Sequence, residues 1–273
     1  MKNIIKTTTL IAASALLLTA CKKHEDFQEN PNSPSTALPS LLLTNISIST
    51  FNPWPLDAAY ASRHLTFYER PSVFIQYNWN RGSFGAFDVL RQVNDMERLA
   101  RATNETNYLG VAKFFRAVHF LQLTETFGDI PYSEAMKATE GIAQPKYDTQ
   151  EQIYAGILKE LDEANDLLDP SKPSLGGDII FGKTPNQATQ RWKQLVNAFR
   201  LRVLIHLSKK ENNNLLNVKS QFSQIISNPT KYPLMKSNAD NAQLAYNTSS
   251  TTNAYPTFQN LSVQTSISLE KRF

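Results

Sequence analysis

Apolar residues recur at spacings of three and four along most of this chain, which is the spacing of amphipathic helices. The stretch 108–127 is apolar on almost every side, so it predicts a central helix with neighbours around it. Gly128 is expected to cap this helix, and Pro131 prevents the helix from continuing. The same spacing predicts further helices at 37–51, 84–102, 150–168, 188–209 and 215–226, and a weaker one at 57–68.

Polar side chains on the central helix cannot all reach water, so we expect some of them to pair with neighbouring helices. They include Lys113, Arg116, His119, Gln122, Thr124 and Glu125. His119 and His206 lie in apolar helical stretches and are interpreted as hydrogen-bonded core residues, not as ligands. Asp162 and Glu163 are expected on a solvated helix face.

The predicted helices form two antiparallel hairpins, at about 84–127 and 150–208. Asn104 or Thr106 can cap the second helix of the first hairpin, and Thr149–Gln152 is a capping-box sequence that opens the second hairpin. Stacked helix pairs are typical of tetratricopeptide-like proteins. The predicted fold class is therefore all-α, with tetratricopeptide-like paired antiparallel helices and long loops.

The N-terminus has the pattern of an exported lipoprotein. Lys2 and Lys6 precede an apolar run that ends at Ala20 and is too short to span a bilayer. Leu18-Thr19-Ala20-Cys21 resembles a bacterial lipobox, which implies cleavage before Cys21 and acylation of that residue, with palmitate as a typical chain. The alternative is an ordinary secretory signal with an incidental cysteine.

Composition then divides the chain into four segments. We expect a lipoprotein signal peptide at 1–20, a tether at 21–40, a helical domain at 41–235 and a polar segment at 236–273 that looks incomplete. A loop at 169–185 has room for a two-residue strand at Ile179–Ile180.

Charge and motifs exclude several function classes. The net charge is +4, and loss of Lys2 and Lys6 with the signal leaves 26 basic and 24 acidic residues, or +2. No dense basic patch is present, so nucleic-acid binding has no electrostatic support. The four histidines have no metal spacing, and common catalytic motifs are absent. We therefore expect no enzymatic activity, no metal and no cofactor.

Aromatic residues in a proline-broken region are the more suggestive feature. Such rings can stack on the apolar faces of sugars and other flat ligands. The candidate ligand-binding residues are Trp54, Tyr60, Phe74, Tyr77 and Trp79. The alternative is that these rings only cover the helical core. Trp192, at helical spacing, is interpreted as a core residue.

Four features in one order carry a family resemblance. They are the lipobox with the tether Asn30–Pro34, the segment Ala112–Ala135 with its Gly-Asp-Ile-Pro-Tyr-Ser turn, the helix Tyr147–Ala164, and Gly176–Gly182 followed by Arg191–Ser208. Together they resemble the SusD/RagB family of Bacteroidetes outer-membrane lipoproteins, in its SusD-like branch. Family members are considerably longer, so the chain is expected to be truncated at its C-terminus.

The resemblance implies a non-catalytic protein, anchored by lipid to the outer membrane and exposed at the cell surface. It would capture a glycan, oligosaccharide or peptide and cap a SusC-like TonB-dependent barrel, against which the helical half packs. The alternative is a helical scaffold lipoprotein that mediates protein contacts without binding a small ligand. A lipid-anchored hydrolase is a third class, supported only by scattered acidic residues. The Gly-Asp-Ile-Pro-Tyr turn is assigned to structure, with Asp129 bonded to nearby amides.

Overall fold

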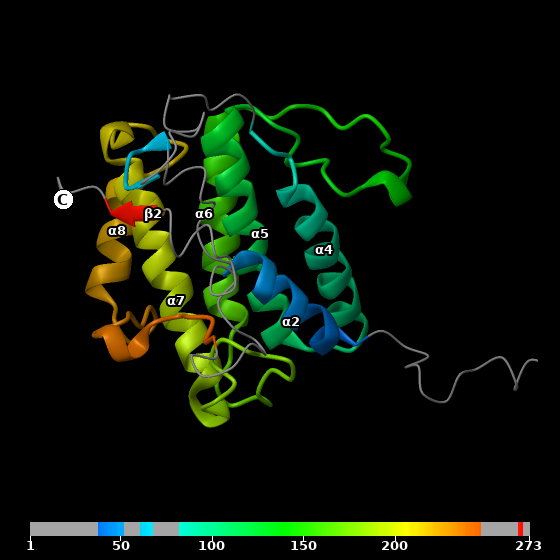
Figure 1. Ribbon diagram of the computed structural model, residues 1–273, viewed down its shortest axis with the longest axis vertical. Coiled ribbons are helices and arrows are strands. Elements are labelled where there is room, and N and C mark those ends of the chain that lie inside the picture. Colours follow the sequence, from blue (N-terminus) through cyan, green and yellow to red (C-terminus); the bar gives the residue numbers. More distant parts are fainter. Residues whose placement is uncertain (1–37, 52–60, 68–81, 247–266, 270–273) are drawn as a thin grey trace, which may run out of the picture. The chain divides into compact units, whose positions relative to one another are not determined.

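The computed structural model describes residues 38–51, 61–67, 82–246 and 267–269. These residues form helices and one short pair of strands, all within the compact unit Pro39–Phe273 (Figure 1). The α-helices are α2 (Pro39–Thr50), α4 (Ala86–Ala102), α5 (Thr106–Phe127), α6 (Gln150–Leu167), α7 (Pro185–His206) and α8 (Val218–Ser227). Single turns of 3₁₀-helix lie at η3 (Ala138–Glu140), η4 (Ser208–Lys210) and η5 (Asn238–Asp240).

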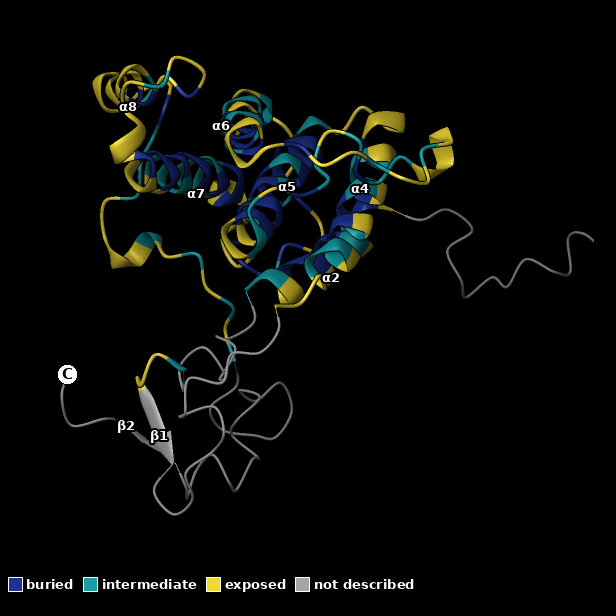
Figure 2. Ribbon diagram, turned by 90° about the horizontal axis from the view of Figure 1, so that it is seen from above, coloured by how far each residue is buried: buried dark blue, intermediate teal, exposed yellow. Residues whose placement is uncertain are grey.

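Helix α5 is the hub of the fold, as its all-round apolar pattern predicts. Fourteen of its 22 residues are buried, and it contacts α2, α4, α6 and α7. Its buried face appears dark blue at the centre of the helices in Figure 2. Gly128 closes the helix with φ of +77°, and its N–H donates to the carbonyl oxygen of Thr124 at 2.8 Å. Both the central position and the glycine cap are thereby confirmed.

Consecutive helices pack side by side from α4 to α8, and α2 lies on α4 and α5. The predicted hairpins are therefore α4–α5 and α6–α7, and the all-α, tetratricopeptide-like pairing is confirmed. Helix α6 begins with the predicted capping box, in which Thr149 and Gln152 bond each other's backbone N–H groups. Helix α7 begins three residues earlier than predicted because Pro185 occupies its first turn, where a missing N–H costs nothing.

Three local predictions are wrong. Leu65–Phe67 is strand β1 and not the end of a helix, because it pairs antiparallel with β2 (Ile267–Leu269) far along the chain. Ile179 and Ile180 form no strand; the chain bends at these residues. The N-cap of α5 is Glu105, without a side-chain cap, so neither Asn104 nor Thr106 has that role.

Polar residues of α5 do pair with neighbouring helices, as expected. Arg116 Nε lies 2.7 Å from Glu160 Oε1, and Lys113 Nζ lies 2.8 Å from Glu163 Oε2, both on α6. Asp162 and Glu163 lie on a partly solvated face, as expected, with side chains 38% and 40% exposed, but Asp162 also bonds the buried Arg200 of α7. These carboxylates therefore join α6 to the helices on either side of it.

The two helical histidines differ. His119 is buried, with Nε2 2.9 Å from Thr50 Oγ1 of α2, so its assignment to the core is confirmed. Burial lowers the pKa of His119 to about 4, which keeps the ring neutral. His206 is exposed and lies 3.1 Å from Glu125, so the core interpretation is wrong there. The last turn of α7 buries Val203 and Leu204, and His206 lies on its outward side.

Candidate ligand-binding site

The candidate residues taken from the sequence lie outside the described part of the chain. They are the lipid-attachment residue Cys21 and the aromatic residues Trp54, Tyr60, Phe74, Tyr77 and Trp79. The structure therefore neither brings them together nor separates them. The described residues nevertheless contain a hollow and a row of aromatic rings. Both include residues from the segment 84–87, which follows this aromatic region in the sequence.

The connector between α5 and α6 is fixed by two carboxylates. Asp129 accepts from the N–H of Gln150 at 2.8 Å, so its expected bond to a nearby amide is confirmed. Asp148 accepts from the N–H groups of Tyr132 and Ser133 at 3.2 and 2.7 Å, and from Ser133 Oγ at 2.9 Å. Burial alone would raise the pKa of Asp148, but these hydrogen bonds outweigh it and hold the pKa below its usual value.

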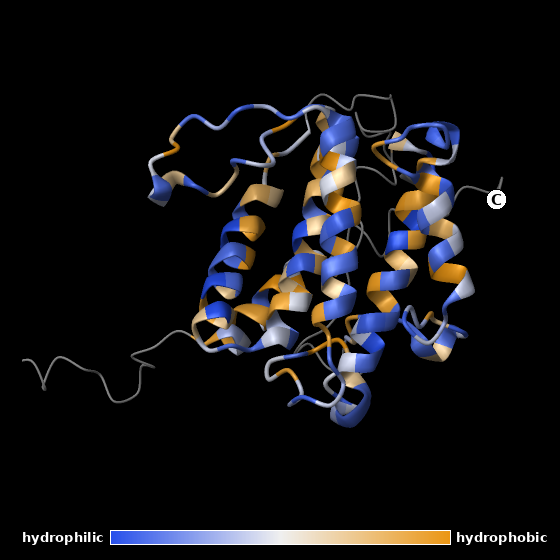
Figure 3. Ribbon diagram, turned by 180° about the vertical axis from the view of Figure 1, so that it is seen from behind, coloured by the Kyte–Doolittle hydropathy of each residue, from blue (hydrophilic) through white to orange (hydrophobic). Residues whose placement is uncertain are grey.

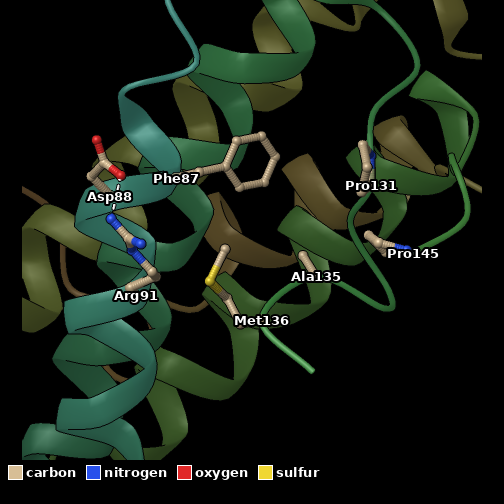
Figure 4. Close-up of a pocket in the computed structure, with 7 residues that line it drawn as sticks. All are labelled: Phe87, Asp88, Arg91, Pro131, Ala135, Met136 and Pro145. Carbon is tan, nitrogen blue, oxygen red and sulfur yellow. Dashed lines mark hydrogen bonds and ion pairs between the residues drawn. The ribbon is translucent and has the colours of Figure 1, made fainter. Parts of the chain in front are cut away.

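This rigid connector forms one wall of a hollow of about 280 Å³, and α4 forms the other (Figure 4). We call it the Phe87 hollow. It is lined by Phe87, Asp88, Arg91, Pro131, Ala135, Met136 and Pro145. Phe87 and Met136 point toward one another, and Asp88 and Arg91 form an ion pair of 2.5 Å at its edge. An apolar floor with charged groups at its mouth can hold the flat face of a ring that carries hydroxyls.

Met136 has a backbone φ of +64°, in the left-handed region that few side chains adopt. Such strain costs roughly 1–3 kcal/mol and tends to occur at functional sites. Here the strained backbone directs the Met136 side chain into the Phe87 hollow (Figure 4).

An aromatic row extends from the hollow. The exposed ring of Phe84 stacks on Phe127 with centroids 4.1 Å apart. Phe87 meets Phe120 edge to face at 6.1 Å, and Phe120 meets Tyr132 at 4.8 Å. The sequence pattern predicted the helix at 84–102 but singled out none of Phe84, Phe87 and Met136 as a candidate site residue. The signal that could have found the row was the closeness of Phe84 and Phe87 to the aromatic loop that precedes them.

A second loop, Gly176–Gly182, connects α2, α5 and α7 through hydrogen bonds. The buried carboxylate of Asp178 accepts from the N–H groups of Ile180 and Phe181, each at 2.9 Å, and from Trp192 Nε1 at 2.8 Å. Gly177 has φ of +74°, and a Cβ there would lie 2.1 Å from the carbonyl oxygen of Ser40. Only glycine fits so close to α2. Trp192 is fully buried, which confirms its assignment to the core.

Within the described ranges, no helix is both long and apolar enough to cross a membrane. The same residues contain no group of three or more His, Cys, Asp or Glu side chains arranged to hold a metal ion.

Comparison with known proteins places this arrangement in a family. A family model named SusD-like, described as starch-binding and associating with the outer membrane, matches residues 31–268. A SusD homologue from Bacteroides fragilis is 41% identical, with a TM-score of 0.70 over 82% of this chain and 46% of its own. An outer-membrane protein from Bacteroides vulgatus, described as involved in nutrient binding, is also 41% identical, with a TM-score of 0.74. The match covers 85% of this chain and 49% of the Bacteroides vulgatus protein.

A chitin-binding SusD homologue from Flavobacterium johnsoniae shares the fold at 17% identity, with a TM-score of 0.55 over 74% of this chain and 44% of its own. No curated protein matches the chain. The chain spans about half the length of these solved structures. The family match, the identity to the two Bacteroides proteins and the shared helical architecture together mean that this chain belongs to the SusD-like family.

Proposed function

We propose that this protein is a cell-surface nutrient-binding lipoprotein that captures a glycan, oligosaccharide or peptide and caps a SusC-like TonB-dependent barrel. Its membership of the SusD-like family is the observation that carries the proposal. The proposal includes the lipid anchor at Cys21, the tether 21–40, the helical domain 41–235 and the polar segment 236–273. It is a binding role, so a captured ligand should leave chemically unchanged.

The Phe87 hollow supports ligand capture. Its volume of about 280 Å³ is just below the roughly 300–1,000 Å³ of sites for drug-sized ligands, so it suits one sugar ring of a longer chain. Phe87 supplies an aromatic face, and Asp88 and Arg91 supply polar groups for hydroxyls. The loop residues Trp54, Tyr60, Phe74, Tyr77 and Trp79 are proposed to extend this surface. Because the family is described as starch-binding, malto-oligosaccharides are the first ligands to test.

An apolar surface at α7 and α8 supports a protein partner. Ile205 of α7, Phe222 and Ile226 of α8, and Leu215 in the segment before α8 are all exposed. Two of them, Ile205 and Phe222, line a hollow of about 340 Å³ together with Leu204 and Val218. Hydrophobic positions along the helices are orange in Figure 3. Large exposed apolar side chains that gather in one region favour a protein contact.

Calorimetric titration with maltotriose, maltoheptaose and a neutral tripeptide tests the Phe87 hollow. Arg91→Ala and Phe87→Ala should each weaken binding of the preferred ligand about tenfold, which corresponds to about 1.4 kcal/mol. Arg91 is largely exposed, so its variant should retain the fold. Phe222→Ala is the matched aromatic control, because Phe222 lies on α8, at the opposite end of the row of helices from α4 (Figure 1). This variant should bind the ligand as the unaltered protein does.

Unchanged affinity in Arg91→Ala and Phe87→Ala would remove the Phe87 hollow from the proposal. If the unaltered protein bound none of these ligands and no other glycan, the alternative of a helical scaffold lipoprotein would be favoured. Recovery of shortened oligosaccharides after incubation would contradict the non-catalytic role.

A further inference from the structure

We propose that a second hollow, beside the start of α7, binds the anionic group of an acidic saccharide, either a carboxylate or a sulfate ester. This inference rests on the proposed nutrient-binding function. The hollow has a volume of about 200 Å³ and lies between the Gly176–Gly182 loop, α7 and the segment after α8. We call it the α7 hollow. The residues on which its chemistry depends are Phe181, Lys183, Arg191, Asn238, Asn241 and Gln243.

The inner wall of the α7 hollow is held in place by buried hydrogen bonds. Phe181 and Ile180 are buried, and their backbone N–H groups donate to the buried carboxylate of Asp178. The outer wall, orange in Figure 1, is held by a capping box in which Asp240 accepts from the N–H of Ser237 at 3.0 Å. The hollow is thus preformed on both sides, which lowers the entropy cost of binding.

Two cations face this space. Arg191 donates from Nη2 to the carbonyl oxygen of Ala239 at 2.5 Å, and its guanidinium lies 5.5 Å from the centroid of the Phe181 ring. This hydrogen bond uses one N–H of the Arg191 guanidinium and fixes the orientation of its plane. The other N–H groups of the guanidinium remain available to a carboxylate or sulfate. Lys183 is exposed, and none of the described residues forms an ion pair with it.

Two carboxylates adjacent to the lining in sequence, Asp178 and Asp240, are already hydrogen-bonded. Asp178 is occupied by two backbone N–H groups and the indole of Trp192. Asp240 is occupied by the N–H groups of Lys236 and Ser237, and these bonds lower its pKa. Neither carboxylate lines the α7 hollow. Arg191 interacts electrostatically with Asp240 but forms no ion pair with it, and Lys183 has no ion-pair partner among the described residues. An added anion would therefore supply a direct partner.

Amide side chains complete the lining. Asn238, Asn241 and Gln243 are exposed, and none of their side chains has a hydrogen-bond partner among the described residues. A primary amide both donates and accepts, which matches the hydroxyl groups of a sugar. Free amides beside two cations and a buried aromatic wall favour a saccharide that carries an anion over a simple inorganic anion. The small volume limits the site to a single sugar unit.

Calorimetric titration with three oligosaccharides tests this proposal. Trigalacturonate carries carboxylates, a sulfated carrageenan tetrasaccharide carries sulfate esters, and maltotriose is neutral. We expect one or both acidic ligands to bind, with an affinity that falls as salt rises. Lys183→Gln should weaken that binding about tenfold, and Arg191→Gln at least as much, while maltotriose binding is unchanged. Lys183 has no partner within the described ranges, so its variant should retain the fold.

Lys209→Gln, which removes an exposed lysine at the far end of α7, is the matched control and should leave the affinity for acidic ligands unaltered. Binding of acidic ligands that Lys183→Gln does not weaken would overturn the α7 hollow as their site. Binding of maltotriose alone would overturn the inference and leave the proposed function standing. Binding of trigalacturonate but not the sulfated ligand, or the reverse, identifies which anion the site accepts.

Discussion

Replacement of Asp178 by alanine should lower the free energy of unfolding by on the order of 4 kcal/mol. The carboxylate accepts three hydrogen bonds in a buried position, from Ile180, Phe181 and Trp192. Each buried donor left without a partner costs roughly 1–3 kcal/mol. The loop that loses its anchor also joins α2 to α5, through Thr44 Oγ1 and Tyr108 Oη on the carbonyl oxygens of Gly177 and Gly176.

Urea unfolding followed by helical circular dichroism measures this loss as a fall in the midpoint at constant slope. Asp178→Asn should be intermediate, since an amide oxygen can still accept from the two backbone N–H groups while Trp192 loses its acceptor. Asp169→Ala is the matched control. Asp169 makes a similar turn, accepting from the N–H of Ser171 at 2.9 Å, but at the surface, so its loss should be much smaller. Equal midpoints for Asp178→Ala and Asp169→Ala would contradict the anchoring role.

Replacement of Arg116 by methionine should cost about 3–5 kcal/mol of unfolding free energy, because it leaves a buried carboxylate without its counterion. Glu160 is 8% exposed and lies 2.7 Å from Arg116. Burial raises the pKa of Glu160, and the guanidinium of Arg116 opposes this rise. Arg116 also packs on the rings of Phe120 and Tyr132, at 4.6 and 5.4 Å from their centroids.

A double-mutant cycle separates the ion pair from this packing. The variant with both Arg116→Met and Glu160→Met should recover much of the lost stability, since an apolar pair of similar volume can replace a buried ion pair. Arg98→Met is the surface control. Its partner Asp95 lies 3.5 Å away and both side chains are more than half exposed, so the change should stay within about 0.5 kcal/mol. A double variant no more stable than Arg116→Met would contradict the assignment of the loss to the unpaired carboxylate.

The helices could be predicted from the sequence because their signals are local. The all-round apolar pattern of 108–127 fixed α5 as the hub, and the Thr149–Gln152 capping box fixed the start of α6. Gly128 marked the end of α5 because its positive φ of +77° is a backbone conformation that favours glycine. Each of these signals lies within a few residues of the feature that it determines.

The errors arose where a distant partner decides the outcome. Leu65–Phe67 forms a strand only because Ile267–Leu269 pairs with it. The bond between Asp162 of α6 and Arg200 of α7 also crosses a helix contact that the periodicity of α6 does not reveal. The burial of Asp178 and the strained backbone of Met136 likewise depend on how loops fold back onto helices. Periodicity contains no information on such contacts, so the α7 hollow could not be predicted from the sequence.

The most direct measurement of the central claim is affinity purification of the tagged, full-length protein from outer membranes of the source bacterium, combined with protease treatment of intact cells. The account predicts that a large TonB-dependent β-barrel co-purifies in near-equal amount, that Cys21→Ser releases the protein from the membrane, and that added protease degrades the protein on intact cells. A protein that is protected on intact cells and purifies without a barrel would contradict the account.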